Sequence, residues 1–471
     1  MNPADLEVNL NKAELQTRIE MLNFPVVFNN LKASADVTPI PELWAVARIL
    51  PAQRTYTVWH WTGTHNAVTY ERTTATNSAP TVTTIAAPGF PSIQLPLVAA
   101  VPASTTYTDQ TLSLTGAGLA TSGGISYALF TSHVRGDVYG GEIFAAKYNY
   151  DDLSSFEAEF SVFDNTADYN DLTVELNTTL WMAGDNNARG AIVRKVPVAD
   201  LAALAADKMQ ATDFTLTNYN MPILGPSGNS ITIPKANAGT TTAEENQLWV
   251  VAGGTSYGGL VVMDKNDDTR LFTRMDRANA KHFDMCETSH GSGSYGAFLW
   301  GDGDFGNDNA NLRIFNTSNG PFAYTDYTIP ADVTFEGKNA IDVDGSIADG
   351  FFVYCAMGAD GVYKINAATG AVADSFNGMD TYGSQGAYAG LANGLVVHGD
   401  YVYVAWGASG LVVLDKATLS MVGQYNGIGS CNYVAVDTTD TINPPPGETI
   451  IWAGFGTGGM VMLKYVNNVN P

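Results

Sequence analysis

Cysteine and basic residues are scarce in this chain of 471 residues. Its 3 cysteines, Cys286, Cys355 and Cys431, form no Cys-x-x-Cys pair, so disulfides are not expected to hold the fold together. Lys and Arg number 23 against 47 Asp and Glu, which gives a formal net charge of −24. A surface of that sign repels nucleic-acid phosphates and anionic lipid, so neither is an expected partner.

Long helical patterns and long apolar runs are also missing. No stretch is long and apolar enough for a transmembrane segment, and residues 1–20 are too polar for a secretory signal. The chain is instead rich in glycine, with 47 residues, and is 45% hydrophobic but only 15% charged. This composition predicts an all-β protein with many turns and a large core.

A β-hairpin pattern recurs in the C-terminal half. Residues 400–415 read Asp-Tyr-Val-Tyr-Val-Ala-Trp-Gly-Ala-Ser-Gly-Leu-Val-Val-Leu-Asp, which is two apolar strands around a glycine turn. In this repeat the second strand begins at Val362, Leu411 and Met460, each 49 residues after the last. A period of about 40–50 residues with strand content is typical of propeller blades.

Eight second-strand starts can be aligned in this way, and five of the seven intervals between them are 49 to 52 residues. The eight starts are Ala67, Glu142, Ala191, Leu260, Leu312, Val362, Leu411 and Met460. Two longer intervals contain segments that look inserted, at about residues 73–124 and 197–240. We therefore predict a single β-propeller over residues 25–471, with eight blades, or seven if the irregular first repeat is not a true blade.

Residues 1–24 have the pattern of one short helix. Asn11 and Glu14 fit a capping box, and Leu15, Ile19 and Leu22 would form its apolar side. A strand at residues 24–29 follows. We expect it to complete the last blade and close the ring, because an open ring leaves an unpaired sheet edge.

The ends of the second strands carry a family resemblance. Residues 411–418, Leu-Val-Val-Leu-Asp-Lys-Ala-Thr, and residues 362–370, Val-Tyr-Lys-Ile-Asn-Ala-Ala-Thr-Gly, resemble the quinoprotein-like and YVTN-type propeller repeats. Residues 260–264, Leu-Val-Val-Met-Asp, are similar to the LVIVD repeat of bacterial surface proteins. The resemblance spans residues 245–465 and implies a propeller. It implies no bound quinone, because the tryptophan docking motifs of quinoprotein dehydrogenases are missing.

Each candidate blade has an aromatic residue in the strand before the aligned start. We interpret these residues as core packing between blades, and exposed platforms for sugar stacking are the alternative. They are Trp59 and Trp61, Tyr127, Trp181, Trp249, Trp300, Tyr354, Trp406 and Trp452.

An Asn, or once a His, recurs just before each expected innermost strand. A ring of such side chains could form a polar mouth that binds a glycan or a peptide. Alternatively, each Asn makes an Asx turn that serves folding alone. The candidate ligand-binding residues are Asn170, Asn237, Lys281, His282, Lys338, Asn339, Asn393 and Asn432.

A calcium site is a second hypothesis. Asp302, Asp304 and Asp308 alternate with glycine and asparagine in residues 301–310, and hard oxygen ligands suit Ca²⁺. The EF-hand pattern fails because no Glu stands at its last position. The alternative is an ordinary solvated hairpin loop.

No motif for nucleophilic, phosphate-binding or zinc chemistry is present, so we expect a non-catalytic binding or scaffold protein that recognises a glycan or protein partner at the axial face of the propeller. Its composition favours an exported protein on the outer surface of a bacterium, where a signal or lipid-anchor peptide would precede it. Two alternatives stay open. One is a propeller enzyme acting on polysaccharide, as a hydrolase or lyase, since such enzymes take carboxylates from different blades. The other is a structural subunit of a surface assembly.

Overall fold

The structure is a computed structural model, and it describes the main strands and several turns of the chain. The described residues are 55–58, 83–86, 92–94, 112–134, 141–148, 157–164, 167–175, 178–186, 190–200, 217–219, 227–233, 246–253, 259–265, 270–274, 280–285, 295–301, 309–316, 323–333, 339–346, 350–377, 390–425, 431–436, 448–454 and 460–466. Within these ranges no helix is long and apolar enough to cross a membrane.

Seven antiparallel sheets of four strands make up most of the described fold. The first holds β4 (Leu112–Ser122), β5 (Ile125–Val134), β6 (Gly141–Tyr148) and β7 (Glu157–Asp164). The second holds β8 (Ala167–Glu175), β9 (Thr179–Asn186), β10 (Gly190–Pro197) and β11 (Thr217–Tyr219). The third holds β12 (Ser227–Thr232), β13 (Gln247–Gly253), β14 (Gly259–Asp264) and β15 (Arg270–Arg274).

The remaining four sheets have the same up-and-down order. The fourth holds β16 (Ala280–Met285), β17 (Tyr295–Gly301), β18 (Asn309–Asn316) and β19 (Tyr324–Asp332). The fifth holds β20 (Ala340–Ser346), β21 (Gly350–Ala356), β22 (Val362–Asn366) and β23 (Val372–Phe376). The sixth holds β24 (Ala392–His398), β25 (Tyr401–Trp406), β26 (Leu411–Asp415) and β27 (Met421–Tyr425). The seventh holds β28 (Tyr433–Val436), β29 (Glu448–Gly454), β30 (Met460–Val466) and β3 (Ser92–Gln94).

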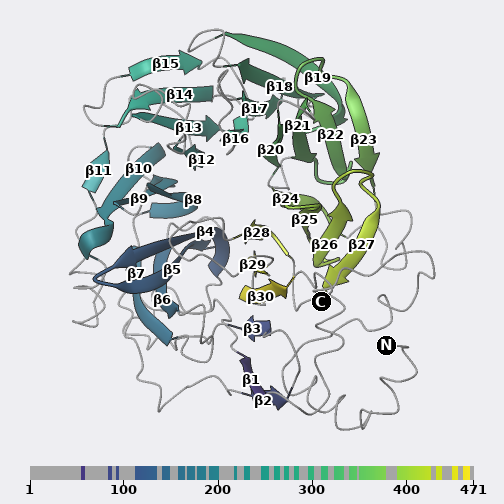
Figure 1. The fold of residues 1–471 in the computed structure, drawn as a ribbon. Coiled ribbons are helices and arrows are strands. Elements are labelled where there is room, and N and C mark those ends of the chain that lie inside the picture. Colours follow the sequence, from purple (N-terminus) through teal and green to yellow (C-terminus); the bar gives the residue numbers. More distant parts are fainter. Residues whose placement is uncertain are drawn as a thin grey trace, which may run out of the picture.

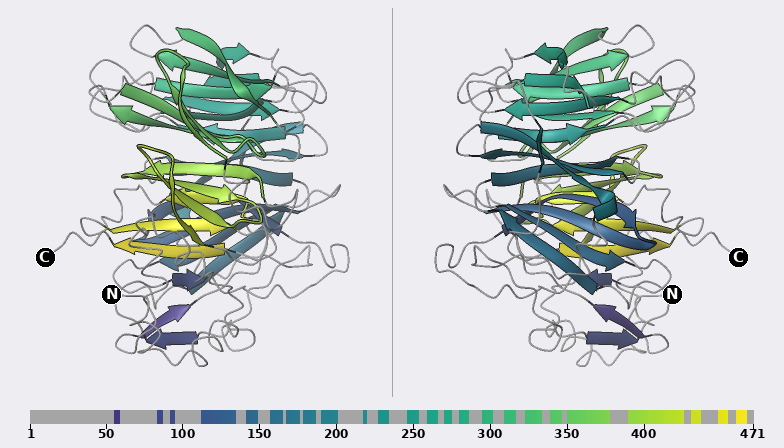
Figure 2. Two further views of the ribbon diagram at one scale, coloured as in Figure 1. Left: turned by 90° about the vertical axis from the view of Figure 1, so that its right-hand side faces the viewer. Right: turned by 90° about the vertical axis from the view of Figure 1, so that its left-hand side faces the viewer.

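The sheets stand around a common axis in chain order, with the first strand of each sheet innermost (Figure 1). Inner strands of neighbouring sheets contact each other from β4 to β8 and onward to β28, which in turn contacts β4. A two-stranded sheet of β1 (Thr55–Val58) and β2 (Thr83–Ala86) lies outside this arrangement, beyond β3 (Figure 2). One 3-10 turn, η2 (Val198–Asp200), follows β10.

Seven of the eight aligned repeat starts lie in the third strand of a sheet, from Glu142 in β6 to Met460 in β30. The eighth, Ala67, lies outside the described residues, as do the expected helix at residues 1–24 and the closing strand at 24–29. In the described part the seventh sheet is completed by β3, whose Ile93 is the register partner of Met462.

Both segments expected as insertions contain inner strands. β4 lies within residues 73–124, and β12 lies within residues 197–240. The small residues of β4 made this segment look like an inserted loop. Their actual role is to let β4 pack closely against the inner strand of the next sheet. A Cβ on Gly116 would lie 2.9 Å from the backbone nitrogen of Leu172 in β8, so only glycine lets the two inner strands approach so closely.

The core lies in layers between neighbouring sheets, and the aromatic residues fill it. The described members of the aromatic series are at most 5% exposed, which confirms the core-packing interpretation: Tyr127, Trp181, Trp249, Trp300, Tyr354, Trp406 and Trp452. They do not all face the same way. Trp249 stacks at 4.4 Å on Phe283 of the following sheet, whereas Trp406 meets Phe376 of the preceding sheet edge-on at 5.6 Å.

The turns follow the predicted chemistry. Gly407 and Gly410 have φ of 48° and 83°, which only glycine adopts without strain. At the opposite end of β26, Asp415 Oδ1 accepts a hydrogen bond from the backbone N–H of Thr418 at 2.8 Å. Asn366 Oδ1 does the same for Thr369 at 3.1 Å, so the side chain of each residue holds the turn that follows its strand.

Candidate functional site at the axial end

Near the start of most inner strands, one residue has no partner in the ladder to the second strand. Such a β-bulge aims an extra side chain out of the regular alternation. It occurs at Thr115, Asn170, Asn229, Lys281 and Asn393. Asn339 and Asn432 hold the corresponding place directly before β20 and β28. These seven residues are called the bulge ring below.

The bulge ring includes four of the predicted asparagines, Asn170, Asn339, Asn393 and Asn432. It also corrects the prediction in two sheets. In the fourth sheet the position belongs to Lys281, because His282 is paired with Leu299 in the ladder.

In the third sheet the bulge position belongs to Asn229 of β12, which precedes Asn237 in the chain. Asn237 and Lys338 lie outside the described residues. Thr115 was not predicted, since its strand had been read as an insertion. Its signal was the Leu-Thr-Gly run, in which a small polar residue stands before glycine as Asn393 stands before Gly394.

Three members of the bulge ring bind the next sheet in the same way. Each donates a side-chain hydrogen bond to the carbonyl of the residue just before the next ring position. Thr115 Oγ1 donates to Tyr169 O at 2.6 Å, Asn229 Nδ2 to Ala280 O at 2.7 Å, and Asn393 Nδ2 to Cys431 O at 3.4 Å. The recurring asparagine thus has a structural role in these sheets. The role differs from the expected Asx turn, because the side chain bonds to a carbonyl of the next sheet and not to its own turn.

Two other asparagines of the ring are tied within their own sheet. Asn170 Nδ2 donates to Asp185 Oδ1 at 3.0 Å, and Asn339 Nδ2 donates to Ala356 O at 3.3 Å. Asn339 and Asn393 are only 3% and 7% exposed. The ring residues left half-buried, and so able to meet a ligand, are Asn170, Asn229, Lys281 and Asn432.

Backbone hydrogen bonds join the fifth, sixth and seventh sheets at this same end. Gly358 and Ala392 exchange two bonds of 3.0 and 2.9 Å, and Gly407 and Cys431 exchange two of 2.9 and 2.8 Å. In the fifth and sixth sheets, the glycine turn between the second and third strands therefore packs against the start of the next inner strand. This contact positions the bulge ring.

Aspartates of the inner strands satisfy backbone groups that face the axis. An inner strand has a neighbour on one side only, so half of its N–H groups lack a ladder partner. Asp171 Oδ2 accepts from Ile231 N at 3.0 Å, Asp284 Oδ2 from Val343 N at 2.8 Å, and Asp342 Oδ2 from Val397 N at 2.5 Å. In each case the carboxylate comes from one sheet and the N–H from the next.

These aspartates were missed by sequence reasoning, although a signal existed. Asp284 and Asp342 each stand three residues after a member of the bulge ring, Lys281 and Asn339. That spacing places them on the same inner strand. Knowing that these aspartates lie on a strand does not show that their carboxylates bond to the backbone of the next sheet.

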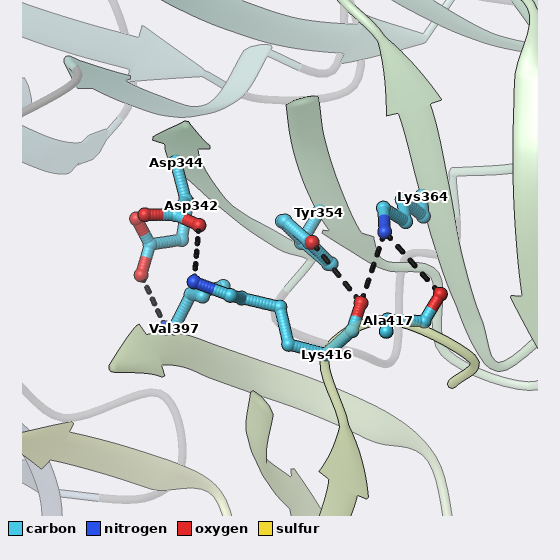
Figure 3. Close-up of polar contacts among 7 residues, drawn as sticks. All are labelled: Asp342, Asp344, Tyr354, Lys364, Val397, Lys416 and Ala417. Atoms are coloured by element: carbon cyan, nitrogen blue, oxygen red, sulfur yellow. Dashed lines mark hydrogen bonds and ion pairs between the residues drawn. The ribbon is translucent and has the colours of Figure 1, made fainter. Parts of the chain in front are cut away.

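A second polar cluster, shown in Figure 3, links the fifth and sixth sheets near the end of β20 opposite to Asn339. Lys416 Nζ lies 3.0 Å from Asp344 Oδ2. Lys364 Nζ donates to the carbonyls of Lys416 and Ala417 at 3.0 and 3.4 Å, and Tyr354 Oη also donates to Lys416 O, at 3.3 Å. Side chains of the fifth sheet thus hold the β26–β27 turn of the sixth.

Burial sets the protonation of groups in these interfaces. Desolvation raises the pKa of the Tyr354 phenol, and the charges of Asp344, Asp342 and Asp415 raise it further. Desolvation lowers the pKa of Lys364. Burial also raises the pKa of the Cys431 thiol, so the thiol stays protonated and is a poor nucleophile at neutral pH.

The inner strands carry mostly negative charge. Their described acidic residues are Asp168, Asp171, Glu175, Asp284, Asp342 and Asp344, all half-buried. The only Lys or Arg among the described inner-strand residues is Lys281. The inner strands are therefore polar and mostly negative in charge, and their charged groups come from separate sheets.

No group of three or more His, Cys, Asp or Glu side chains in the described ranges could hold a metal ion. The predicted calcium ligands Asp302, Asp304 and Asp308 lie outside those ranges, between β17 and β18, so that site stays a prediction.

Comparison with known proteins gives one family match. The family described as LVIVD repeat matches residues 389–427, which are the sixth sheet and the residues leading into it. A search of curated proteins gave no match. Among solved structures, Sqt1 of Saccharomyces cerevisiae is similar with a TM-score of 0.48 and 9% identity, over 76% of this chain and 97% of that one.

The matched repeat contains the Leu-Val-Val-Leu-Asp run of β26, one of the second-strand ends on which the resemblance was based. In the part of the chain that the structure describes, the same four-stranded unit occurs seven times around one axis (Figure 1). The chain is therefore a β-propeller repeat protein.

Proposed function

We propose that this β-propeller is a non-catalytic binding or scaffold protein whose glycan or protein partner sits at the axial end. One observation carries the proposal. Half-buried polar side chains lie at the same end of the inner strands of separate sheets that are tied together, among them Asn170, Asn229, Lys281 and Asn432. A rigid polar surface assembled in this way suits recognition because its groups need no ordering when the partner binds.

The fold also supports a proposal about the number of blades in the propeller and about how the propeller closes. We infer that it has seven blades, each one of the four-stranded sheets, and that β3 closes it. Contacts of β28 and β29 with β4 support closure between the last blade and the first. Cysteines at Ile93 and Met462, which are register partners, should form a disulfide within one chain on mild oxidation. Cross-linking between chains only would contradict closure by β3.

Localisation on the outer surface of a bacterium belongs to the same proposal. It is supported by the composition of the chain and by the low number of lysines and arginines beside 47 acidic residues. A cell fractionation of the source organism with an antibody to this protein tests it. Recovery with the cytosolic fraction would contradict it.

A binding screen tests the function. The wild-type protein is applied to arrays of glycans and of peptides, together with the variants Lys281→Ala and Asn432→Ala. We expect at least one wild-type ligand whose signal falls about tenfold in these variants, which corresponds to about 1.4 kcal/mol. Asn339→Ala is the matched control, because Asn339 is buried and should change the melting temperature without changing the ligand.

The outcomes are distinct. Binding that all three variants retain would place the ligand elsewhere on the molecule and overturn the axial-end proposal. Absence of any ligand on both arrays would favour a purely structural subunit. Release of product from an arrayed polysaccharide would favour the enzyme alternative.

A further inference from the structure

The outermost strand of the fourth sheet presents an exposed row of three side chains. Tyr324, Asp326 and Thr328 are alternate residues of β19 and therefore share one face. All three are exposed, and Tyr324 is 43% exposed. Among the described residues only Tyr324 and Val372 are large exposed hydrophobics. These three residues are called the β19 row.

A buried arginine fixes the first two members of the β19 row. Arg313 of β18 is 1% exposed, and its Cζ lies 3.7 Å from the centroid of the Tyr324 ring. Its Nε and Nη2 donate to Asp326 Oδ1 and Oδ2, both at 2.6 Å, in a bidentate pair. Phe315 meets the Tyr324 ring from the side at 6.0 Å. The aromatic ring and the carboxylate are thus preorganised.

The third member is fixed as well. Thr328 Oγ1 donates to Asn311 Oδ1 at 2.9 Å, and Asn311 Nδ2 donates to Asn309 O at 3.0 Å. Hydrogen-bonding side chains therefore continue along the row beyond Asp326. The row combines an apolar ring, a carboxylate and a hydroxyl, each held at one place by β18.

Electrostatics select the kind of ligand. The positive charge of Arg313 is cancelled locally by Asp326, so the row has no net charge to attract a cation or an anion strongly. An exposed aromatic face binds the apolar face of another ring, and a fixed carboxylate accepts hydrogen bonds from hydroxyl groups. Neutral sugars offer both features. We propose that the β19 row is a binding site for a neutral glycan.

A purely structural role explains only part of the row. Asp326 and Pro330 on an outer strand discourage pairing with another chain, which is a common protection of sheet edges. That role does not need a large aromatic ring 43% exposed. The glycan site is independent of the axial end, because it lies on the outer strand of one sheet.

The test is affinity electrophoresis in native gels that contain a soluble neutral polysaccharide. Laminarin, dextran, xyloglucan and galactomannan are used as separate probes, and alginate serves as an anionic control. We expect at least one neutral probe, but not alginate, to retard the wild-type protein. Tyr324→Ala should raise the apparent Kd for that probe about tenfold, whereas Tyr324→Phe, which keeps the ring, should raise it less than about threefold.

Val372→Ala is the matched control. Val372 lies on the outer strand β23 of the next sheet and is 41% exposed, so its truncation removes a similar kind of surface without touching the row. It should leave retardation unchanged. Asp326 is kept intact in all variants, because its removal would leave the buried Arg313 charge unpaired and threaten the fold.

Three results would overturn the proposal. They are unchanged retardation of Tyr324→Ala, equal losses in Tyr324→Ala and Val372→Ala, and no retardation of the wild type by any neutral probe. Failure here leaves the axial-end proposal standing, since Lys281→Ala and Asn432→Ala do not touch the β19 row. Loss of retardation in those two variants, with Tyr324→Ala unaffected, would instead place the glycan at the axial end.

Discussion

The carboxylate of Asp342 accepts a hydrogen bond from the backbone N–H of Val397 at 2.5 Å, across the boundary between the fifth and sixth sheets. The donor belongs to an inner strand whose axial side has no further strand to pair with. A side chain of one blade thus completes the backbone hydrogen bonding of the next. Blades that share bonds in this way depend on their neighbours for stability.

Removal of this acceptor should destabilise the ring. For Asp342→Ala we expect the free energy of unfolding to fall by about 1 to 3 kcal/mol, because the Val397 N–H loses its partner. Asp342→Asn keeps an acceptor oxygen and should lose less than about 1 kcal/mol. Urea denaturation of the three proteins measures both values. Equal stability of Asp342→Ala and the wild type would show that water replaces the carboxylate without cost.

The docking of a hairpin turn onto the next blade should depend on glycine. In Gly407→Ala the new Cβ would lie 2.7 Å from Leu391 N and 2.8 Å from the Gly390 Cα, and φ is +48°. We expect a loss of more than about 2 kcal/mol in the free energy of unfolding, from strain and from disruption of the Gly407–Cys431 pair.

Gly399→Ala is the matched control for that change. Gly399 has a similar φ of +58°, but nothing lies within 4 Å of an added Cβ. Only the strain of a positive φ applies at Gly399, so we expect the free energy of unfolding to fall by about 1 kcal/mol. If thermal or urea unfolding gives the same loss for both variants, close packing at Gly407 does not matter.

Alkaline pH should destabilise the fold through buried phenols. Burial raises the pKa of both Tyr169 and Tyr354. Above about pH 10 the unfolded chain loses these protons while the folded protein keeps them, so the free energy of unfolding falls as the pH rises. Below about pH 10 this contribution is fully present.

A variant isolates the Tyr354 part of this effect. Tyr354→Phe should cost about 0.5 to 1 kcal/mol at about pH 8, since one hydrogen bond to Lys416 O is lost while that of Lys364 stays. The difference from the wild type should shrink or reverse at about pH 11. A constant difference at both pH values, measured by urea unfolding, would argue against a raised phenol pKa.

The two buried thiols should be inert in the native protein. Cys355 and Cys431 are 0% exposed, and burial raises the pKa of each thiol. With Cys286→Ser in the background, Ellman's reagent should label neither thiol at about pH 8 and both in denaturant. Rapid native labelling would mean that an inter-blade layer opens on the time scale of the reaction.

Much of the fold was accessible to sequence reasoning because each repeat is local. The glycine turn at residues 407–410 uses backbone chemistry that neighbouring residues decide, and it was predicted at the right place. The period of 49 residues then gave the sheet order. The first and third sheets were harder to recognise, since their inner strands β4 and β12 are rich in glycine, serine and threonine.

The residues of the axial end were predicted less well, because their contacts join different sheets and are not local in the sequence. Asn393 was found because asparagine recurs, but Asn229 was not, because β12 lies in the segment that was read as an insertion. No local pattern shows that Asp284 reaches a backbone N–H of the next blade. Likewise, Tyr324 has no counterpart in the repeat, and its exposure follows from the place of β19 at the outside of a sheet.

The sequence by itself determined the strands, their turns and their repetition, because hairpin formation depends on glycine, Asx and β-branched residues that act over a few positions. The tertiary structure alone decided what those strands do for each other. It placed Thr115, Asn229 and Asn393 of the bulge ring against carbonyls of the next sheet, and it placed aspartates against the N–H groups of unpaired edges. Such groups must find partners when water is excluded, and only the closeness of neighbouring blades decides which partners they find.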